Sequence, residues 1–456
     1  MQYLGIEYQM KHPPKLDPQF IPFGVWRAAY LKDAAQPIAI AVERDKGRVS
    51  VHHTCIHGTP EMAEADYRYV ERYVKFLLWS TGGFRVSICG CPELAQRMQK
   101  SYTADGERQF DFHFVNQLYE RDLEILDLPL EACPASNEVP ESIGGYMDGC
   151  RIGFDAGGSD RKVSAVIDGE TVYSEEVVWH PKTQTDPAYH YAEIVSALRT
   201  AASKLPRVDG IGVSSAGVFI GNAPMVSSLF ISVPPESRGP IHTIYDRAAA
   251  AIGDVPVVVA NDGDVTALAG AMSLRDTGVM GLAMGTSEAA GYVNREGSIP
   301  GWFNELAFAP VDLNPHAAQD EWSGDAGVGC KYFSQDAVNK LALAASIPLD
   351  DALTPAEKLT AVQRLAEQGD DRALAVFRDI GVYLGHTLPL YASVYDLKHL
   401  LVLGRVASGI GGEQIIAACR RVLAEEYPAL AVSVTLPDEQ FRRVGQSMAA
   451  ASLPEV

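Results

Sequence analysis

The spacing of hydrophobic residues predicts an α/β region at the start of the chain. Two alternating runs, residues 38–44 and 48–54, flank a short turn and predict a hairpin. Apolar residues then recur at helical spacing, which predicts a helix over residues 62–80. A strand at residues 84–90 and a helix near residues 93–101 complete this region.

The same order of elements returns further along the chain. Strands around tight turns are expected over residues 151–179, a helix over residues 189–204 and a strand over residues 208–217. Either a degenerate duplication of an actin-like subdomain or chance explains the repetition, because this order is common in α/β proteins. Strands then alternate with helices, including a long helical stretch over residues 335–392 and a final helix from Glu413, which favours α/β layers.

One segment between these two parts lacks both hydrophobic periods. Residues 131–149 combine Pro, Ser, Gly and acidic residues, a composition that is typical of a linker. We therefore expect an N-terminal α/β domain over residues 1–130, followed by the linker and a larger part that ends at residue 456.

Composition narrows the classes of partner. The 456-residue chain is 47% hydrophobic and 21% charged, as expected of a globular protein. Its formal net charge of −20 argues against nucleic acid or an anionic membrane as the main partner. Residues 1–16 lack the apolar core of a signal peptide, and the strongest apolar run, residues 255–260, is too short to span a bilayer. We therefore expect a cytoplasmic protein, with its seven cysteines reduced.

Histidines and cysteines gather on two predicted strands. His53, Cys55 and His57 alternate on one strand, and Cys89 and Cys91 alternate near another. If the strands are neighbours, these side chains could surround a metal ion, although the spacing matches no zinc knuckle. Packing in the core is the favoured interpretation, because Cys is among the most buried residue types.

A glycine-rich turn after the linker is suited to phosphate. The segment Asp155-Ala156-Gly157-Gly158-Ser159 follows an apolar strand. Its glycines allow the backbone to approach a phosphate closely, and the carboxylate of Asp155 can hold hydrated Mg²⁺. A plain hairpin turn is the alternative, since such turns are common.

Further strand ends carry similar chemistry. Glycine-rich turns lie at Gly285-Thr286 and at Gly404, the latter followed by Gly411 and Gly412 at a helix start. Between the first two turns, Asn261 and Asp262 close a strand, which is where α/β enzymes tend to place catalytic groups. An ordinary turn is the alternative there, because Asn-Asp-Gly favours turns.

The order of these motifs resembles that of the ROK family of sugar kinases and sugar-responsive regulators, over about residues 151–456. Residues 155–159 look like the family's Asp-x-Gly-Gly-Thr motif, residues 211–217 like GIGxPG, residues 261–269 like NDANAAALAE, residues 285–286 like the second phosphate motif and residues 304–308 like GEIGH. The resemblance implies a two-lobed, actin-like ATPase fold of the ribonuclease H-like class, with lobes over residues 150–265 and 266–456 and an additional N-terminal α/β domain.

The resemblance also implies an ATP- and Mg²⁺-dependent kinase that phosphorylates a hydroxyl of a sugar, amino sugar or cyclitol. Asp262 would be the general base, and Asp155 would hold Mg²⁺ through water. The expected substrate contacts are Asn261, Glu305, Ser215 and Gly217. The expected ATP contacts are Asp155, Gly157, Gly158, Ser159, Gly285, Thr286, Gly404, Gly411 and Gly412.

One family motif is missing from the sequence. In ROK proteins a His of GEIGH and three Cys of CxCGxxGC bind zinc, whereas the His position here is Phe308. Placing the motif's Gly-x-x-Gly on residues 324–327 puts the Cys positions at Glu321, Ser323 and Val328. Because all four ligands are replaced together, we expect no zinc.

Two other functions stay open. A ROK-type regulator would carry a basic N-terminal helix-turn-helix, but residues 1–150 hold 15 Lys and Arg against 21 Asp and Glu. A catalytically silent sensor or scaffold is the second alternative, favoured by the missing zinc motif and by Ser159 in place of Thr. A homodimer is expected only from the general prevalence of two-fold oligomers.

Overall fold

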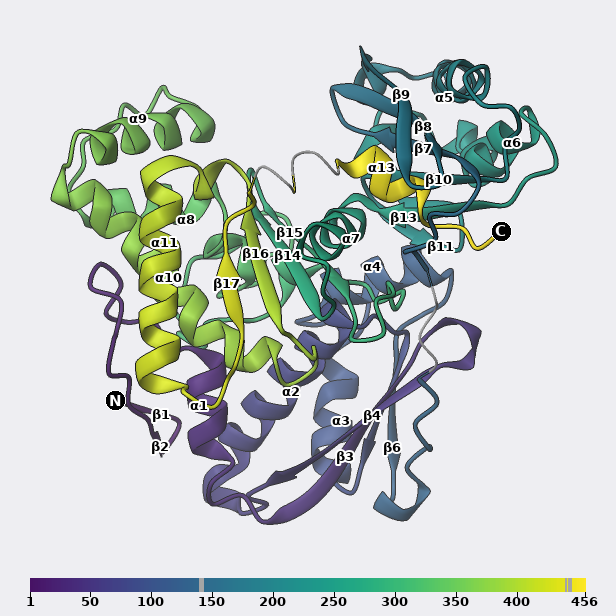
Figure 1. The fold of residues 1–456 in the computed structure, drawn as a ribbon. Helices are drawn as coiled ribbons and strands as arrows, with labels where there is room; N and C mark the ends of the chain where they lie inside the picture. Colours follow the sequence, from purple (N-terminus) through teal and green to yellow (C-terminus); the bar gives the residue numbers. More distant parts are fainter. Residues whose placement is uncertain (139–142, 439–440, 442–444) are drawn as a thin grey trace. The chain divides into compact units, whose positions relative to one another are not determined.

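Helices and strands alternate along the chain in the computed structural model, which describes residues 1–138, 143–438, 441 and 445–456 (Figure 1). They form two compact units. Unit 1 consists of Met1–Val139, Leu282–Ala290 and Trp302–Leu436, and unit 2 consists of Pro140–Gly281, Gly291–Gly301 and Pro437–Val456. Residues 1–130 thus share unit 1 with most of the C-terminal part of the chain.

The central sheet of unit 2 has the strand order β13-β10-β7-β8-β9. Its strands are β7 (Cys150–Ala156), β8 (Asp160–Ile167), β9 (Glu170–Val178), β10 (Gly210–Ser215) and β13 (Val257–Asn261). β8 runs antiparallel to both β7 and β9, whereas β10 is parallel to both β7 and β13. This mixed five-stranded sheet is the arrangement expected of a ribonuclease H-like lobe, and it confirms the strands predicted over residues 151–179.

Helices cover this sheet closely. They are α5 (Pro187–Ala202), α6 (Ile244–Ala250), α7 (Asp262–Leu274) and α13 (Gln446–Ala451). On β7, a Cβ at Gly153 would lie 1.6 Å from the carbonyl oxygen of Ser447 in α13. On β10, a Cβ at Gly212 would lie 1.7 Å from the carbonyl oxygen of Ala450. Only glycine lets α13 approach the sheet this closely.

The N-terminal region of unit 1 contains a sheet with the order β4-β3-β5-β6. Its elements are α1 (Phe23–Tyr30), β3 (Gln36–Glu43), β4 (Val49–Ile56), α2 (Ala63–Ser80), β5 (Arg85–Cys89), α3 (Pro92–Ser101), α4 (Gln109–Tyr119) and β6 (Glu124–Leu128). The predicted hairpin and the two predicted helices are confirmed. Helices α1 and α4 were not predicted from the sequence, although the buried residues of α1, Phe23, Trp26 and Tyr30, follow helical spacing.

The strand directions contradict the duplication hypothesis. In unit 2, the strand that follows the helix, β10, is parallel to the first strand of the hairpin, β7. In the N-terminal sheet, the corresponding strand β5 is antiparallel to β3. The two regions therefore share an order of elements but not a topology.

The strand order also separates the predicted metal ligands. Because β3 lies between β4 and β5, the strand that carries His53 and Cys55 is not the neighbour of the strand that carries Cys89. His57 hydrogen-bonds the carbonyl of Tyr30 (3.1 Å). No group of three or more metal-ligating side chains occurs among the residues that the structure describes.

The C-terminal part of the chain contains further helices and a second sheet, with the order β15-β14-β16-β17. Its elements are β14 (Val279–Met284), β15 (Glu288–Val293), α8 (Gln335–Ala344), α9 (Pro355–Glu367), α10 (Asp371–Tyr391), β16 (His399–Leu403), α11 (Gly409–Glu426) and β17 (Ser433–Thr435). The long helical stretch predicted over residues 335–392 is three helices. Thr354 and Glu357 form a capping box that starts α9, and Asp370 caps α10.

The start of the predicted linker is attached to the N-terminal hairpin. The backbone N–H of Asn137 donates to the carbonyl of Val49 (2.8 Å), and Glu138 pairs with the buried Arg44 (2.7 Å). Residues 139–142 of the predicted linker lie outside the described residues. Over the described chain, the helices are all too short or too polar to cross a bilayer.

Candidate functional site

The carboxyl ends of three adjacent parallel strands lie together in unit 2. The register pairs Asp155 of β7 with Ser214 of β10, and Ser215 of β10 with Asn261 of β13. Asp262 follows directly as the first residue of α7. Polar groups from three strands therefore meet at one edge of the sheet, the edge at which α/β proteins bind their ligands.

Asp155 is a buried carboxyl group with a perturbed pKa. The hydroxyl of Ser214 donates a 2.8 Å hydrogen bond to Asp155 Oδ1. Burial and the negative charge of Asp262 together raise the pKa of Asp155 to about 6, against the lowering effect of the Ser214 hydrogen bond. The two predicted carboxylates are thus close enough to interact electrostatically.

Asp262 has a raised pKa as well. Burial is the main cause, while the backbone N–H of Gly263 and the positive charge of Lys182 lower the pKa. A carboxylate whose pKa is raised toward neutrality is suited to accept a proton in catalysis. Asp262 is therefore a more basic carboxylate than an exposed aspartate.

Asn261 links the start of α7 to Gly217, another of the predicted substrate residues. Its side-chain oxygen accepts from the N–H of Gly263 (2.7 Å), which caps α7, and its amide nitrogen donates to the carbonyl of Gly217 (2.7 Å). The cap fixes the start of α7, and so it also fixes the backbone of Asp262. Asn261 therefore has a structural function in addition to any contact with a substrate.

Lys182 was not identified from the sequence. A Cβ on Gly158 would lie 2.9 Å from Lys182 Nζ, so the ammonium group lies against the glycine turn. The backbone that carries Lys182 is fixed, because buried His190 hydrogen-bonds the carbonyl of Pro181 (3.0 Å). No motif marks this lysine in the sequence. Its only signal is a cation soon after β9, the second strand that follows the turn.

Trp179 holds the glycine turn in shape. Its indole N–H donates to the carbonyl of Gly157 (2.7 Å), and its backbone N–H donates to the carbonyl of Ser159 (3.1 Å). The side chain of Ser159 is exposed. The predicted phosphate turn is thus anchored on one side, with an exposed hydroxyl and a lysine on it.

Ser215 is placed differently from the other predicted substrate residues. It is fully buried, and its hydroxyl shares a 2.7 Å hydrogen bond with the buried hydroxyl of Tyr245. Packing between β10 and α6 accounts for this side chain. In this structure the hydroxyl points into the interior and is not presented at the strand ends.

Unit 1 brings together another group of predicted residues. Gly404 has a φ of +88°, and a Cβ there would lie 2.4 Å from the carbonyl oxygen of Met284, so only glycine fits. The ends of β14 and β16 therefore lie side by side, with Gly285 directly after Met284. The side chain of Thr286, the next residue, is exposed.

Gly411 and Gly412 are explained by packing. A Cβ on Gly411 would lie 2.9 Å from the ring of Phe377 in α10, and a Cβ on Gly412 would lie 2.0 Å from the carbonyl oxygen of Ala407. Both glycines are buried. Close approach of α11 to its neighbours is sufficient to require them.

Glu305 lies in unit 1, beside a buried acid that the sequence analysis did not identify. Burial raises the pKa of Glu288 to about 8, and the charge of Glu305 adds to this effect. The hydroxyl of Tyr391 donates to Glu288 Oε1 (3.3 Å), while the buried Oε2 has no hydrogen-bond partner among the described residues. The sequence around Glu288 is typical of a turn, so it does not predict that the Glu288 side chain is buried.

The position expected for the zinc-binding His belongs to an aromatic cluster. The ring of Phe308 lies 4.6 Å from that of Trp79, 5.3 Å from that of Phe110 and 5.2 Å from that of Trp322. Of the positions matched to Cys, Val328 is buried in the core. Apolar packing thus takes the place expected for a ligand at Phe308.

No family model and no curated protein matches the sequence. Solved structures do match the fold. The chain is similar to a ROK hexokinase from Thermus thermophilus, with 19% identity, a TM-score of 0.52 and coverage of 66% of this chain and 96% of that one. It is also similar to a ROK-family transcriptional regulator, a homologue of the E. coli MLC protein, with 17% identity, a TM-score of 0.51 and coverage of 67% and 79%.

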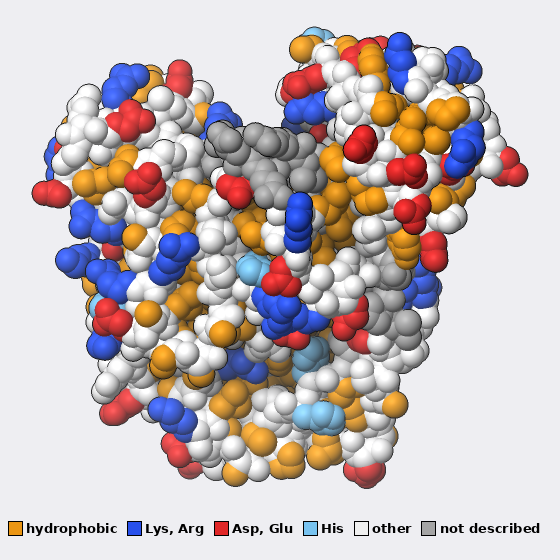
Figure 2. Space-filling model, in the orientation of Figure 1, with side chains coloured by type: hydrophobic (Ala, Val, Ile, Leu, Met, Phe, Trp, Pro, Cys, Tyr) orange, Lys and Arg blue, Asp and Glu red, His pale blue; other side chains and the backbone are white. Residues whose placement is uncertain are grey.

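These matches confirm the predicted fold, that of the actin-like ROK proteins. A kinase and a regulator share this fold, so the fold alone does not decide between the two functions. The N-terminal 138 residues form a mixed sheet with helices instead of the helix-turn-helix of a regulator. Acidic and basic side chains are interspersed on the face that Figure 2 shows, in keeping with the net charge of −20.

Proposed function

We propose that this chain, whose fold is that of the ROK proteins, transfers the terminal phosphoryl group of ATP to a hydroxyl of a sugar, amino sugar or cyclitol. One observation carries the proposal: Asp155, Asp262 and Lys182 converge at the glycine turn of unit 2. Phosphoryl transfer requires mainly positioning and charge neutralisation. These side chains supply a metal-binding carboxylate, a base and a cation.

Asp262 is the proposed general base. The acceptor hydroxyl loses its proton to the Asp262 carboxylate while its oxygen bonds to the terminal phosphorus, and the bond to the bridging oxygen of ADP breaks. The raised pKa of Asp262 increases its basicity, and the positive charge of Lys182 opposes that rise. Asn261 fixes Asp262 through the helix cap.

The residues at Asp155 fit a hydrated Mg²⁺ ion. Burial and the nearby charge of Asp262 raise the pKa of Asp155, and a divalent cation would offset both effects. When bound, Mg²⁺ would neutralise phosphate charge. The absence of side chains at Gly157 and Gly158 leaves their backbone accessible to phosphate oxygens, and Ser159 adds a hydroxyl.

The remaining predicted residues divide by their packing. Gly285, Thr286 and Gly404 are proposed to contact ATP, and Glu305 and the backbone at Gly217 to contact the acceptor. Contacts in the protein interior explain the hydroxyl of Ser215 and the glycines at 411 and 412, so the proposal does not depend on these three residues.

The test is a comparison of wild type with Asp262→Asn, using Asp254→Asn, an exposed acid of unit 2, as the matched control. Calorimetric titration of ATP with Mg²⁺ should show binding in all three proteins. ADP release with a panel of sugars, amino sugars and cyclitols should fall about 10²- to 10⁴-fold in Asp262→Asn only. Binding without turnover in wild type would favour the silent sensor, and absence of nucleotide binding would reject the kinase.

A further inference from the structure

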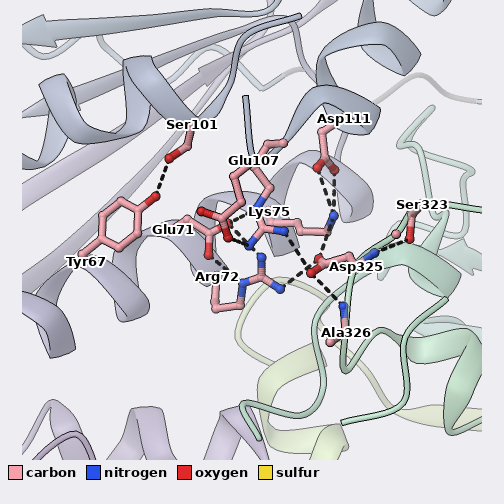
Figure 3. Close-up of polar contacts among 12 residues, drawn as sticks. Tyr67, Glu71, Arg72, Lys75, Ser101, Glu107, Asp111, Ser323, Asp325 and Ala326 are labelled. Carbon is pink, nitrogen blue, oxygen red and sulfur yellow. Dashed lines mark hydrogen bonds and ion pairs between the residues drawn. The ribbon is translucent and has the colours of Figure 1, made fainter. Parts of the chain in front are cut away.

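Six charged side chains form a buried cluster in unit 1 (Figure 3). Three are cations and three are anions, and each is at least nine-tenths buried. They are Glu71, Arg72 and Lys75 of α2, Arg108 and Asp111 at the start of α4, and Asp325 of a long loop over residues 302–334. Five of the six thus come from the N-terminal region, and only Asp325 comes from the loop.

Asp325 contacts all three cations of the cluster. Its Oδ2 lies 2.9 Å from Arg72 and 3.0 Å from Lys75, and its Oδ1 lies 2.9 Å from Arg108. The N–H of Ala326 also donates to Oδ1 (2.9 Å). Although burial opposes ionisation, these cations hold the pKa of Asp325 well below its usual range.

The other two acids of the cluster carry two negative charges against the three positive charges of the cations. Glu71 pairs with Arg72 (2.7 Å) and with Arg108 (2.6 Å), and Asp111 pairs with Lys75 (2.9 Å). Without Asp325, three buried cations would face two buried acids and the exposed carboxylate of Glu107, which pairs with Arg108 (3.1 Å). A buried, uncompensated charge is strongly unfavourable, so α2 and α4 require the carboxylate that the loop supplies.

The same loop is held by α2 and α4 at a second place. Trp79 of α2 packs against Phe303 (ring centroids 5.4 Å apart) and Phe308 (4.6 Å). Phe110 of α4 packs against Trp322 (5.6 Å). These aromatic contacts involve the residues on either side of Glu305, Phe303 and Phe308, and Trp322 further along the loop.

Backbone pairing connects Asp325 to Glu305. The two arms of the loop form a bridge between Pro310 and Val328, and the N–H of Gly329 donates to the carbonyl of Ala309 (3.0 Å). Glu305 precedes the first arm by a few residues, and Asp325 precedes the second. Fixing Asp325 therefore restricts the backbone from which Glu305 projects.

We propose that Asp325 is a positioning residue, and that the N-terminal region serves to fix the 302–334 loop so that Glu305 is held in place for the acceptor. The proposal rests on the proposed function for the acceptor and on the described contacts for the docking of the loop. It gives residues 1–130 a definite purpose: their helices supply the cations and the aromatic rings that hold the loop.

The decisive experiment compares Asp325→Asn with the double variant Arg72→Met/Asp325→Asn. The single variant leaves one buried cation in excess. The double variant restores neutrality, because Lys75 keeps Asp111 and Arg108 keeps Glu71. We expect the double variant to regain most of the lost melting temperature, while the acceptor KM stays about 10- to 100-fold above that of wild type in both variants.

Hydrogen exchange provides a readout that does not depend on activity. Asp325→Asn and the double variant should both exchange faster over residues 302–334, with unchanged exchange in unit 2. Glu305→Gln should raise the acceptor KM without changing exchange. The proposal is overturned if exchange in the loop is unchanged, or if the KM recovers together with the melting temperature. Absence of turnover in wild type would instead reject the proposed function, and exchange would still decide whether Asp325 docks the loop.

Discussion

The hydroxyl of Ser214 donates a 2.8 Å hydrogen bond to the buried carboxyl of Asp155 from the neighbouring parallel strand. This hydrogen bond stabilises the ionised form of Asp155, and among the described residues no cation forms an ion pair with the Asp155 side chain. The carboxyl therefore combines burial with the nearby charge of Asp262, which explains its pKa of about 6. Such an arrangement is unfavourable for the folded protein alone and favourable for binding a cation.

Asp155→Asn should stabilise the protein and abolish its activity. The folded-state pKa is raised, so the stability contributed by the protonated form is present below the unfolded-state pKa and is lost as pH rises through about 6. The variant escapes this loss. We expect the variant and wild type to have similar melting temperatures at pH 4. At pH 8 the variant should melt at a higher temperature, because its free energy of unfolding should be larger by up to about 3 kcal/mol.

Ser214→Ala provides the matched control for that measurement. It removes the hydrogen bond that favours the ionised carboxyl, so the pKa of Asp155 should rise further and the loss of stability should extend to higher pH. A scan of melting temperature against pH for the three proteins would show this order. A variant Asp155→Asn that is less stable than wild type at pH 8 would contradict the assignment.

Lys182→Met should shift the pH dependence of turnover. Lys182 lowers the pKa of Asp262, so its loss raises that pKa and moves the acidic limb of kcat/KM to higher pH. We also expect kcat to fall about tenfold, because a cation beside the phosphate turn is lost. Lys182→Arg should leave the acidic limb of kcat/KM at its wild-type pH and should retain most of kcat. Equal profiles for Met and wild type would show that Lys182 has no part in the reaction.

Glu288→Gln should reveal the cost of the buried acid in unit 1. The pKa of Glu288 is raised to about 8, so its stabilising protonated form is fully present below the unfolded-state pKa and is lost as pH rises through 8. The variant and wild type should melt at similar temperatures at pH 5, and the variant should melt several degrees higher at pH 9. Parallel curves at all pH values would contradict the raised pKa.

The sequence predicted most elements and the order of the glycine turns, because both depend on local spacing. The hairpin of residues 36–56, helix α2 and the turns at Gly157, Gly285 and Gly404 all follow from short-range patterns. What the sequence did not predict depends on distant residues. Arg72 and Asp325 are 253 positions apart, and the charges of α2 resemble those of a solvated helix face until the fold buries them.

The missing zinc motif illustrates the same limit. One alignment places the glycines of the motif on Gly324 and Gly327. An alignment that ends the motif on Gly329 and Cys330 fits equally well, and it places Asp325 at the second Cys position. The sequence offers no means of choosing between the two alignments. The structure shows three cations around Asp325, so ion pairs hold this part of the loop.

Removal of residues 1–138 should prevent the rest of unit 1 from folding. The helix α1 packs so closely on α10 that a Cβ on Gly24 would lie 3.3 Å from the carbonyl oxygen of His386, and α2 and α4 supply every cation that neutralises Asp325 in the described structure. A fragment of residues 139–456 would expose these apolar and charged surfaces. We expect it to be insoluble, or soluble without a cooperative melting transition, when examined by size-exclusion chromatography and calorimetry. A soluble fragment that melts cooperatively and retains turnover would show instead that the N-terminal region is a dispensable addition, and it would also remove the basis for its function in positioning Glu305.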